Sequence, residues 1–282
     1  MPFTKLGLND QLVQGILATG YSTPTPIQAQ AIPLAVAGRD IIGCAQTGTG
    51  KTAAFMLPMI NLFLNHPSNK GHQTRGLILT PTRELAQQID EFSAAYARFT
   101  NLHCASIFGG VNMSNQIKRL QHGVDIVVAT PGRLLDHINR KTVNLSHVEF
   151  LVIDEADRMF DMGFIQDVKK IISYVPAKRQ TLLFSATMSS EVRKLVASIQ
   201  QNPEQIEIGS RRKPVETVRQ KFYSIQRDAK IDLLLHIFRT QELDSVLIFS
   251  RTKHGADRIS TKLERSGIKS VAIHSNRTQS QR

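Results

Sequence analysis

Short runs of apolar and β-branched residues alternate with longer amphipathic stretches along the first three quarters of the chain. Six of these runs predict β-strands, at residues 40–45, 75–80, 105–108, 125–130, 150–154 and 181–185. Stretches between them, such as 83–99 and 189–200, repeat apolar residues with the period of a helix. Strands that alternate with helices indicate a parallel sheet with helices on both faces. The sequence therefore predicts an α/β fold.

The alternation pauses at residues 209–215, a polar and basic stretch that contains Gly and Pro. This composition predicts a linker between a domain at 1–208 and a second domain at 216–282. The second domain should hold strands near 218–225, 246–250 and 270–274, with helices near 229–239 and 255–265. Three strands are few for an α/β domain, so we expect this part to be loosely packed and 1–208 to fold alone.

Composition adds a basic balance and few cysteines. The chain of 282 residues has a net charge of +12, and residues 210–282 hold 16 basic against 7 acidic side chains. Such a basic region indicates a polyanionic partner, although a solvated surface would have the same composition. No apolar run is long enough for a membrane helix, and the start has no signal-peptide pattern. Cys44 and Cys104 lack metal-ligand spacing, which favours reduced cysteines in a cytoplasmic protein. We expect no membrane partner.

The segment AQTGTGKT at 45–52 follows one predicted strand and opens a predicted helix, which is the context of a phosphate-binding loop. Backbone N–H groups of such a loop converge on phosphate oxygens, and Lys51 adds a mobile positive charge. The hydroxyl of Thr52 can serve as a ligand for Mg²⁺. We expect ATP to be bound by Ala45, Gln46, Thr47, Gly48, Thr49, Gly50, Lys51 and Thr52. Ala45 departs from the generic pattern, which begins with Gly.

The segment DEAD at 154–157 ends another predicted strand, so its carboxylates should lie at the same sheet edge as the phosphate loop. Asp154 is then expected to hold Mg²⁺, and Glu155 to orient or deprotonate the attacking water. Lys51, Asp154 and Glu155 are the predicted catalytic residues. An acidic helix N-terminus, favoured by the helix dipole, is the alternative interpretation of this segment.

Seven motifs occur in the order in which DEAD-box helicases have them, and the resemblance spans nearly the whole chain. They are GYSTPTPIQ at 20–28, AQTGTGKT at 45–52, PTREL at 81–85, GG at 109–110, TPGR at 130–133, DEAD at 154–157 and SAT at 185–187. The stretches FDMGF at 160–164 and LLFSAT resemble the bacterial RhlE branch most. The resemblance implies a RecA-like first domain, a second RecA-like domain of which only part is present, and an ATP-dependent RNA helicase.

The resemblance also assigns roles to individual residues. Gln28 would read the adenine edge and Phe3 would stack on the base; an exposed helical Gln and a hydrophobic anchor are the alternatives. Asp157, Ser185 and Thr187 would couple the nucleotide site to RNA through hydrogen bonds to DEAD, whereas a polar turn is the alternative for Ser185 and Thr187. The residues implied in gripping the RNA backbone are Pro81, Thr82, Arg83, Gly110, Thr130, Pro131, Gly132, Arg133, Arg251, Thr252, Gln279 and Arg282.

The family's second domain continues with ARGxD-like and HRxGRxGR segments, which these 282 residues lack. They supply arginines that stabilise the phosphoryl-transfer transition state. We therefore expect ATP-driven domain closure and local unwinding from a complete relative, and little or none from this chain. A fragment that binds ATP or RNA without turnover is one alternative, and a P-loop ATPase acting on DNA or protein is another. Ribosome-assembly and RNA-decay proteins are both compatible partners.

Overall fold

The computed structural model describes residues 2–46, 48–68, 73–208, 218–278 and 281. The chain divides into two units, Met1–Arg211 and Arg212–Arg282. The predicted linker at 209–215 lies outside the described residues.

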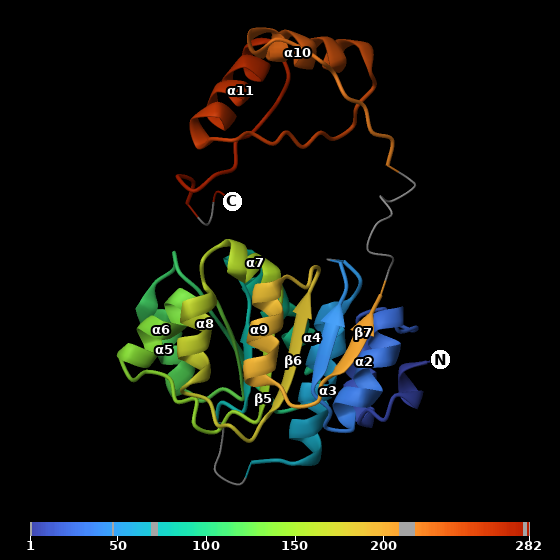
Figure 1. The fold of residues 1–282 in the computed structure, drawn as a ribbon, viewed down its shortest axis with the longest axis vertical. Helices are drawn as coiled ribbons and strands as arrows, with labels where there is room; N and C mark the ends of the chain where they lie inside the picture. Colours follow the sequence, from blue (N-terminus) through green and yellow to red (C-terminus); the bar gives the residue numbers. More distant parts are fainter. Residues whose placement is uncertain (1, 47, 69–72, 209–217, 279–280, 282) are drawn as a thin grey trace. The chain divides into compact units, whose positions relative to one another are not determined.

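A parallel sheet forms the centre of the first unit (Figure 1). Its strands follow one another along the sheet in the order β3-β4-β2-β5-β6-β1-β7, and every neighbouring pair is parallel. They are β1 Ile41–Cys44, β2 Gly76–Leu79, β3 Cys104–Ile107, β4 Ile126–Ala129, β5 Phe150–Ile153, β6 Gln180–Ser185 and β7 Glu204–Glu207. All six predicted strands are confirmed.

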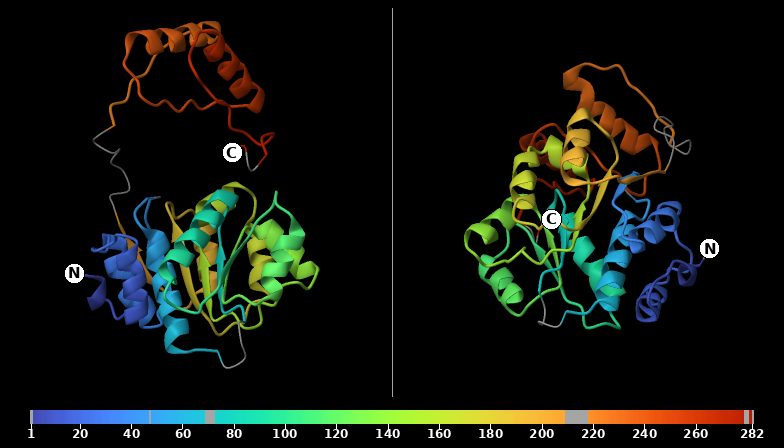
Figure 2. Two further views of the ribbon diagram at one scale, coloured as in Figure 1. Left: turned by 180° about the vertical axis from the view of Figure 1, so that it is seen from behind. Right: turned by 60° about the horizontal axis from the view of Figure 1, so that its bottom comes forward.

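Helices cover both faces of this sheet, as the two views of Figure 2 show. Ile78 packs into one hydrophobic core, and its strand neighbours Leu77 and Leu79 pack into the other. The first core is closed by η1 Phe3–Lys5, α1 Asp10–Ala18, α2 Pro26–Val36, α3 Lys51–Asn65 and α4 Arg83–Tyr96. The second is closed by α5 Met113–Gln121, α6 Pro131–Asn139, α7 Ala156–Asp161, α8 Ile165–Ile172 and α9 Ser190–Ile199. Burial on both faces explains why these strands are continuous apolar runs.

The seventh strand, β7, was not predicted from the sequence. Three of its four residues, in EQIE, are polar, and only Ile206 is buried. β7 lies at the sheet edge beside β1, where polar side chains can remain in water. An edge strand of this kind lacks the apolar run that revealed the other six.

The second unit contains η2 Arg227–Ala229, α10 Lys230–Thr240 and α11 Lys253–Arg265, so its two predicted helices are confirmed. The three predicted strands are wrong, because residues 218–278 contain no assigned strand. Apolar side chains that a sheet would bury are exposed instead, Phe222 by 91% and Phe249 by 88%. A strand needs hydrogen-bonded neighbouring strands, and these segments have none, although Ser270 and His274 contact α11 and Ala272 is buried. No described helix is both long and apolar enough to cross a membrane.

Candidate functional site

The carboxyl edge of the first unit's sheet brings the six predicted site segments that follow strands together. The phosphate loop follows β1, the DEAD segment follows β5, and SAT begins at the last residue of β6. Segments 81–85, 109–110 and 130–133 follow β2, β3 and β4. Because β6 lies between β5 and β1 in the sheet, the segments expected to bind the nucleotide occupy one half of the edge. The segments expected to bind RNA occupy the other half.

The phosphate loop has the backbone conformation that its glycines allow. Gly48 and Gly50 have φ angles of +85° and +90°, in the left-handed region. Lys51 then begins α3, and its Nζ donates to the carbonyl of Ala45 over 3.1 Å. The hydroxyl of Thr49 closes the loop by donating to the carbonyl of Gln46 over 2.8 Å. Thr47, predicted to bind ATP, lies outside the described residues.

Asp154, at the end of β5, lies directly opposite this lysine. Its Oδ1 is 4.0 Å from Lys51 Nζ and accepts a hydrogen bond of 3.0 Å from the Glu155 amide. Only 2% of Asp154 is exposed. Burial raises its pKa to about 6, although Lys51 acts in the opposite direction, and Glu155 adds to the increase. Lys51 therefore compensates only part of the cost of burying this carboxylate.

Glu155 stands at the N-terminus of α7 in a left-handed conformation, with φ of 53°. This region is unfavourable for a residue with a side chain, and such strain is concentrated at functional sites. Arg158, one turn later, donates from Nη1 to Glu155 Oε2 over 3.1 Å. Arg158 was not among the predicted site residues, although its i,i+3 spacing from Glu155 was visible in the sequence.

These residues fit a magnesium–nucleotide complex. Mg²⁺ prefers oxygen ligands and is commonly held by one or two protein groups together with phosphate oxygens. The Asp154 carboxylate and the Thr52 hydroxyl provide such oxygens. A divalent cation would also neutralise the buried carboxylate whose pKa is raised. The exposed turn at Gly48 leaves open space where a Cβ would stand, which suits the approach of phosphates to the backbone.

Gln28 connects α2 to the phosphate loop. Its Oε1 accepts from the amide of Thr25 over 2.9 Å, and its Nε2 donates to the carbonyl of Gly50 over 3.0 Å. Gln28 is buried, unlike the exposed helical glutamine of the alternative interpretation. Phe3 is also buried, with 2% exposed, and packs into the first core, as expected of a hydrophobic anchor. Contacts of Gln28 and Phe3 with a base remain predictions.

The DEAD and SAT segments are joined by hydrogen bonds. The amide and hydroxyl of Thr187 both donate to Asp157 Oδ2, over 2.8 and 2.9 Å. Ser185 Oγ accepts from the Asp157 amide over 3.2 Å and donates to the Thr187 carbonyl over 2.7 Å. The hydrogen bonding expected between these segments is therefore present, and a role in coupling remains a prediction.

Two arginines flank the turn at Gly109 and Gly110. A Cβ added at Gly110, whose φ is +84°, would collide with the guanidinium of Arg83. Arg133 Nη1 donates to the carbonyl of Val111 over 3.2 Å. The structure thus brings together predicted residues from the ends of three strands.

The remaining predicted RNA-binding residues of the first unit lie where helices begin. Thr82 caps α4 by accepting from the Leu85 amide over 3.3 Å. Thr130 is the N-cap residue of α6, Pro131 is its first residue, and Gly132 is exposed. Pro81 is buried, two residues before the start of α4. Exposed N–H groups at a helix start are suited to bind a phosphate.

In the second unit, Thr252 caps α11 by accepting from the Gly255 amide over 3.0 Å, and Arg251 is exposed before it. Gln279 and Arg282, predicted to bind RNA, lie outside the described residues.

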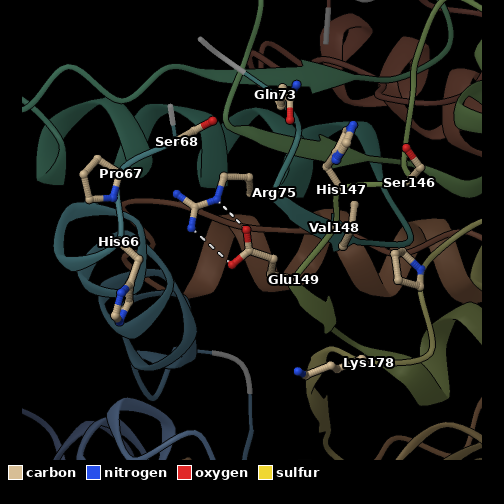
Figure 3. A pocket seen from close by; sticks show the side chains of 11 residues that line it. His66, Pro67, Ser68, Gln73, Arg75, Ser146, His147, Val148, Glu149 and Lys178 are labelled. Carbon is tan, nitrogen blue, oxygen red and sulfur yellow. Dashed lines mark hydrogen bonds and ion pairs between the residues drawn. The ribbon is translucent and has the colours of Figure 1, made fainter. Parts of the chain in front are cut away.

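A cavity of about 410 Å³ opens at the opposite, amino edge of the sheet, away from all these segments (Figure 3). Arg75 and Glu149 line it and form a bidentate ion pair, with Nε–Oε1 of 2.7 Å and Nη2–Oε2 of 3.1 Å. The Arg75 guanidinium also lies 4.4 Å from the ring centroid of Phe63. These charges satisfy each other, so we interpret the ion pair as structural and place the chemistry at the carboxyl edge.

Comparisons with known proteins agree with this arrangement. The family model described as DEAD/DEAH box helicase matches residues 25–195. "ATP-dependent RNA helicase CshA" of Listeria monocytogenes is 41% identical over 280 residues, which are 99% of this chain and 53% of that protein. The protein of the same name from Limosilactobacillus reuteri is 41% identical and is covered over 56% of its length. The chain thus spans about half the length of these relatives.

A solved structure shows the same fold. The crystal structure of a DEAD box protein from the hyperthermophile Methanococcus jannaschii matches with a TM-score of 0.69 and 37% identity, over 100% of this chain and 75% of that one. The expected RhlE branch is not supported, because these bacterial relatives carry the name CshA. The family model and the shared fold together show that the chain belongs to the DEAD/DEAH box helicase family.

Proposed function

We propose that the protein binds ATP and Mg²⁺ at the carboxyl edge of its first unit, binds RNA along the neighbouring half of that edge, and acts as an RNA-dependent ATPase and helicase. One observation carries this proposal: the phosphate loop, DEAD and SAT follow adjacent strands, and DEAD and SAT share hydrogen bonds. The names of the CshA relatives support ATP-dependent action on RNA.

In the proposed ATP site, Lys51 exchanges its bond to the Ala45 carbonyl for a bond to the outer phosphates. Thr52 and Asp154 would hold Mg²⁺, which would supply charge neutralisation for phosphoryl transfer. Glu155 orients or deprotonates the water that attacks the outer phosphate, and Arg158 fixes the direction of its carboxylate. Gln28 holds the phosphate loop through its hydrogen bond to the Gly50 carbonyl. The helix that carries Gln28, α2, borders the proposed site for the base.

In the proposed RNA site, Arg83, Arg133 and the start of α6 contact the sugar-phosphate backbone. Such contacts position RNA without reading its bases, so we expect little sequence preference. Asp157, Ser185 and Thr187 would transmit the state of the nucleotide to this half of the edge. Closure of the second unit over the first would then bend one strand and unwind a short duplex locally. We place this activity in the cytoplasm.

A second candidate is an ATP- and RNA-binding protein without turnover. The observation that favours it is the second unit, where residues 218–278 contain no assigned strand and large apolar side chains are exposed. A unit that is not fully packed would close less well over the ATP site. The intact set of Lys51, Asp154 and Glu155 favours the first candidate.

ATP hydrolysis by residues 1–282 distinguishes the candidates. We would measure turnover with mixed-sequence RNA, with DNA of the same sequence and without nucleic acid, beside Lys51→Ala and Glu155→Gln. RNA-stimulated turnover that both variants lose supports the enzyme. Binding of ATP and RNA without turnover supports the second candidate. Equal stimulation by DNA would contradict RNA as the partner.

A further inference from the structure

Gln116 lies in α5 and connects two parts of the predicted RNA site, the Gly109–Gly110 turn and Arg133. It is only 5% exposed. Its Nε2 donates to the carbonyl of Phe108 over 2.9 Å, just before the Gly109–Gly110 turn. Its Oε1 accepts from Arg133 Nη1 over 3.3 Å, and the same Nη1 donates to the carbonyl of Val111 just after the turn. The turn is therefore held on both sides by a chain of bonds that passes through Gln116.

His137 completes this chain from α6. It is 0% exposed, and its Nε2 lies 3.1 Å from Gln116 Oε1. An amide oxygen can only accept, so Nε2 must carry the proton. Burial, and then Arg133, lower the pKa of His137, which favours the neutral ring. Nδ1 of that ring is then an acceptor, and the Thr142 hydroxyl lies within reach of two acceptors, 2.8 Å from Nδ1 and 3.1 Å from the His137 carbonyl.

The arrangement orients Arg133 without using up its donors. Among the described residues, both hydrogen bonds of Arg133 use Nη1, which leaves Nε and Nη2 for another acceptor. Gln116 Oε1 receives two donors, one from Arg133 and one from His137, and thereby fixes both side chains. A guanidinium that is already oriented loses less conformational entropy when it binds a phosphate.

We propose that Gln116 and His137 are positioning residues for RNA binding: their buried pair holds the Gly109–Gly110 turn and Arg133 in the geometry that receives an RNA phosphate. The inference deepens the proposed function and rests on it. Neither residue touches RNA itself. Since buried polar networks also stabilise folds, RNA affinity must be compared with a variant that loses a similar buried amide elsewhere.

Gln116→Met removes the amide at nearly constant volume. Gln200→Met is the matched control, because buried Gln200 donates to the carbonyls of Ile41 and Thr181 at the far, amino end of the strands. We would measure the Kd of residues 1–282 for a short single-stranded RNA of mixed sequence over a range of salt concentrations. ATP affinity and thermal unfolding would be measured in parallel. Gln116→Met should weaken RNA binding about tenfold, the effect of one charge-assisted hydrogen bond.

The salt dependence of the Kd for RNA distinguishes a loss of Arg133 orientation from a general destabilisation of the fold. If Arg133 loses its phosphate, the slope of log Kd against log salt should fall by roughly 0.7, the value for one contact on a single strand. Gln200→Met should keep the wild-type slope and Kd. ATP affinity should be unchanged in both variants. Equal RNA affinity and slope in Gln116→Met and Gln200→Met would overturn the inference.

A second pair of variants tests the inference if the Gln116→Met protein does not fold. His137→Gln can place an N–H near the position of Nε2, whereas the shorter His137→Asn cannot. RNA affinity should therefore be retained in His137→Gln and reduced in His137→Asn. Equal affinity in the two variants would contradict the role of His137. Wild-type protein that does not bind RNA would contradict the proposed function itself, which is a different outcome.

Discussion

Thr187 is bound to Asp157 twice, because its amide and its hydroxyl donate to the same carboxylate oxygen over 2.8 and 2.9 Å. Asp157 lies three residues after Asp154, and Thr187 lies two residues after the end of β6. The two loops at the centre of the carboxyl edge are therefore fixed to each other. A displacement of one requires that the other follow it or that both bonds break.

Thr187→Val removes the hydroxyl but keeps the amide and the shape of the side chain. We expect a loss of about 0.5–1 kcal/mol in the free energy of unfolding, because Thr187 is exposed. RNA stimulation of ATP hydrolysis should fall while ATP affinity stays constant. A double-mutant cycle with Asp157→Ala measures the coupling. Thr181→Val is the control, since its buried hydroxyl has no hydrogen-bond partner in the described structure. A coupling energy of zero would contradict this prediction.

The pKa of Asp154 predicts how stability depends on pH. Its folded value of about 6 lies above the ordinary 3.8, so between these values the unfolded chain releases a proton that the folded protein keeps. The free energy of unfolding should therefore fall as pH rises from 4 to 7, by about 3 kcal/mol for this residue. Asp154→Asn cannot titrate, and its difference from wild type isolates the effect. Urea unfolding without Mg²⁺ and nucleotide provides the measurement; a difference independent of pH would refute it.

Two glycines with the same backbone conformation should respond differently to alanine. Gly38 has φ of +78° and open space around a Cβ, so Gly38→Ala should cost about 1 kcal/mol from the backbone alone. Gly50→Ala also places a Cβ against the amide of Gln28 and should cost more. It should also weaken ATP binding, which Gly38→Ala should leave intact. Urea unfolding and nucleotide titration test both variants, and equal costs would contradict the contact.

The exposed aromatic residues of the second unit should bind apolar dyes. Phe222→Ser with Phe249→Ser should lower the fluorescence of an added naphthalene-sulfonate dye without lowering the unfolding temperature of the first unit. A chain of residues 1–208 should fold and bind little dye. Phe99→Ser, on the surface of the first unit, is the control for a single exposed aromatic ring. Dye binding by 1–208 as strong as that by 1–282 would argue against this prediction.

The sequence predicted most of the first unit because its strands are buried on both faces. A run such as FLVI of β5 is apolar at every position, and the helix predicted at 83–99 is present as α4 Arg83–Tyr96. The polar strand β7 gave no such signal. The strands expected in the second unit failed for another reason: an apolar run shows what could pair, but pairing requires neighbours that residues 218–278 do not provide.

The candidate site also contains residues that the sequence predicted and residues that it did not. The position of each motif directly after a predicted strand was sufficient to place Lys51 and Asp154 at one edge, because parallel strands end together. The contact between Gln116 and His137 was not predicted. These residues are 21 positions apart on different helices, and neither has a local pattern that indicates a polar core. Only the packing of α5 and α6 brings them together.

The root of the phosphate loop has a mechanical consequence. The amide of Ala45 donates to Ser185 on one side, over 3.2 Å, and the carbonyl of Cys44 accepts from Ile208 on the other, over 2.9 Å. Ile208 is the last described residue before the chain leaves the first unit. The phosphate loop, the SAT segment and Ile208 are thus joined directly to one another by backbone hydrogen bonds. A displacement of the loop therefore acts directly on Ile208 through a backbone hydrogen bond.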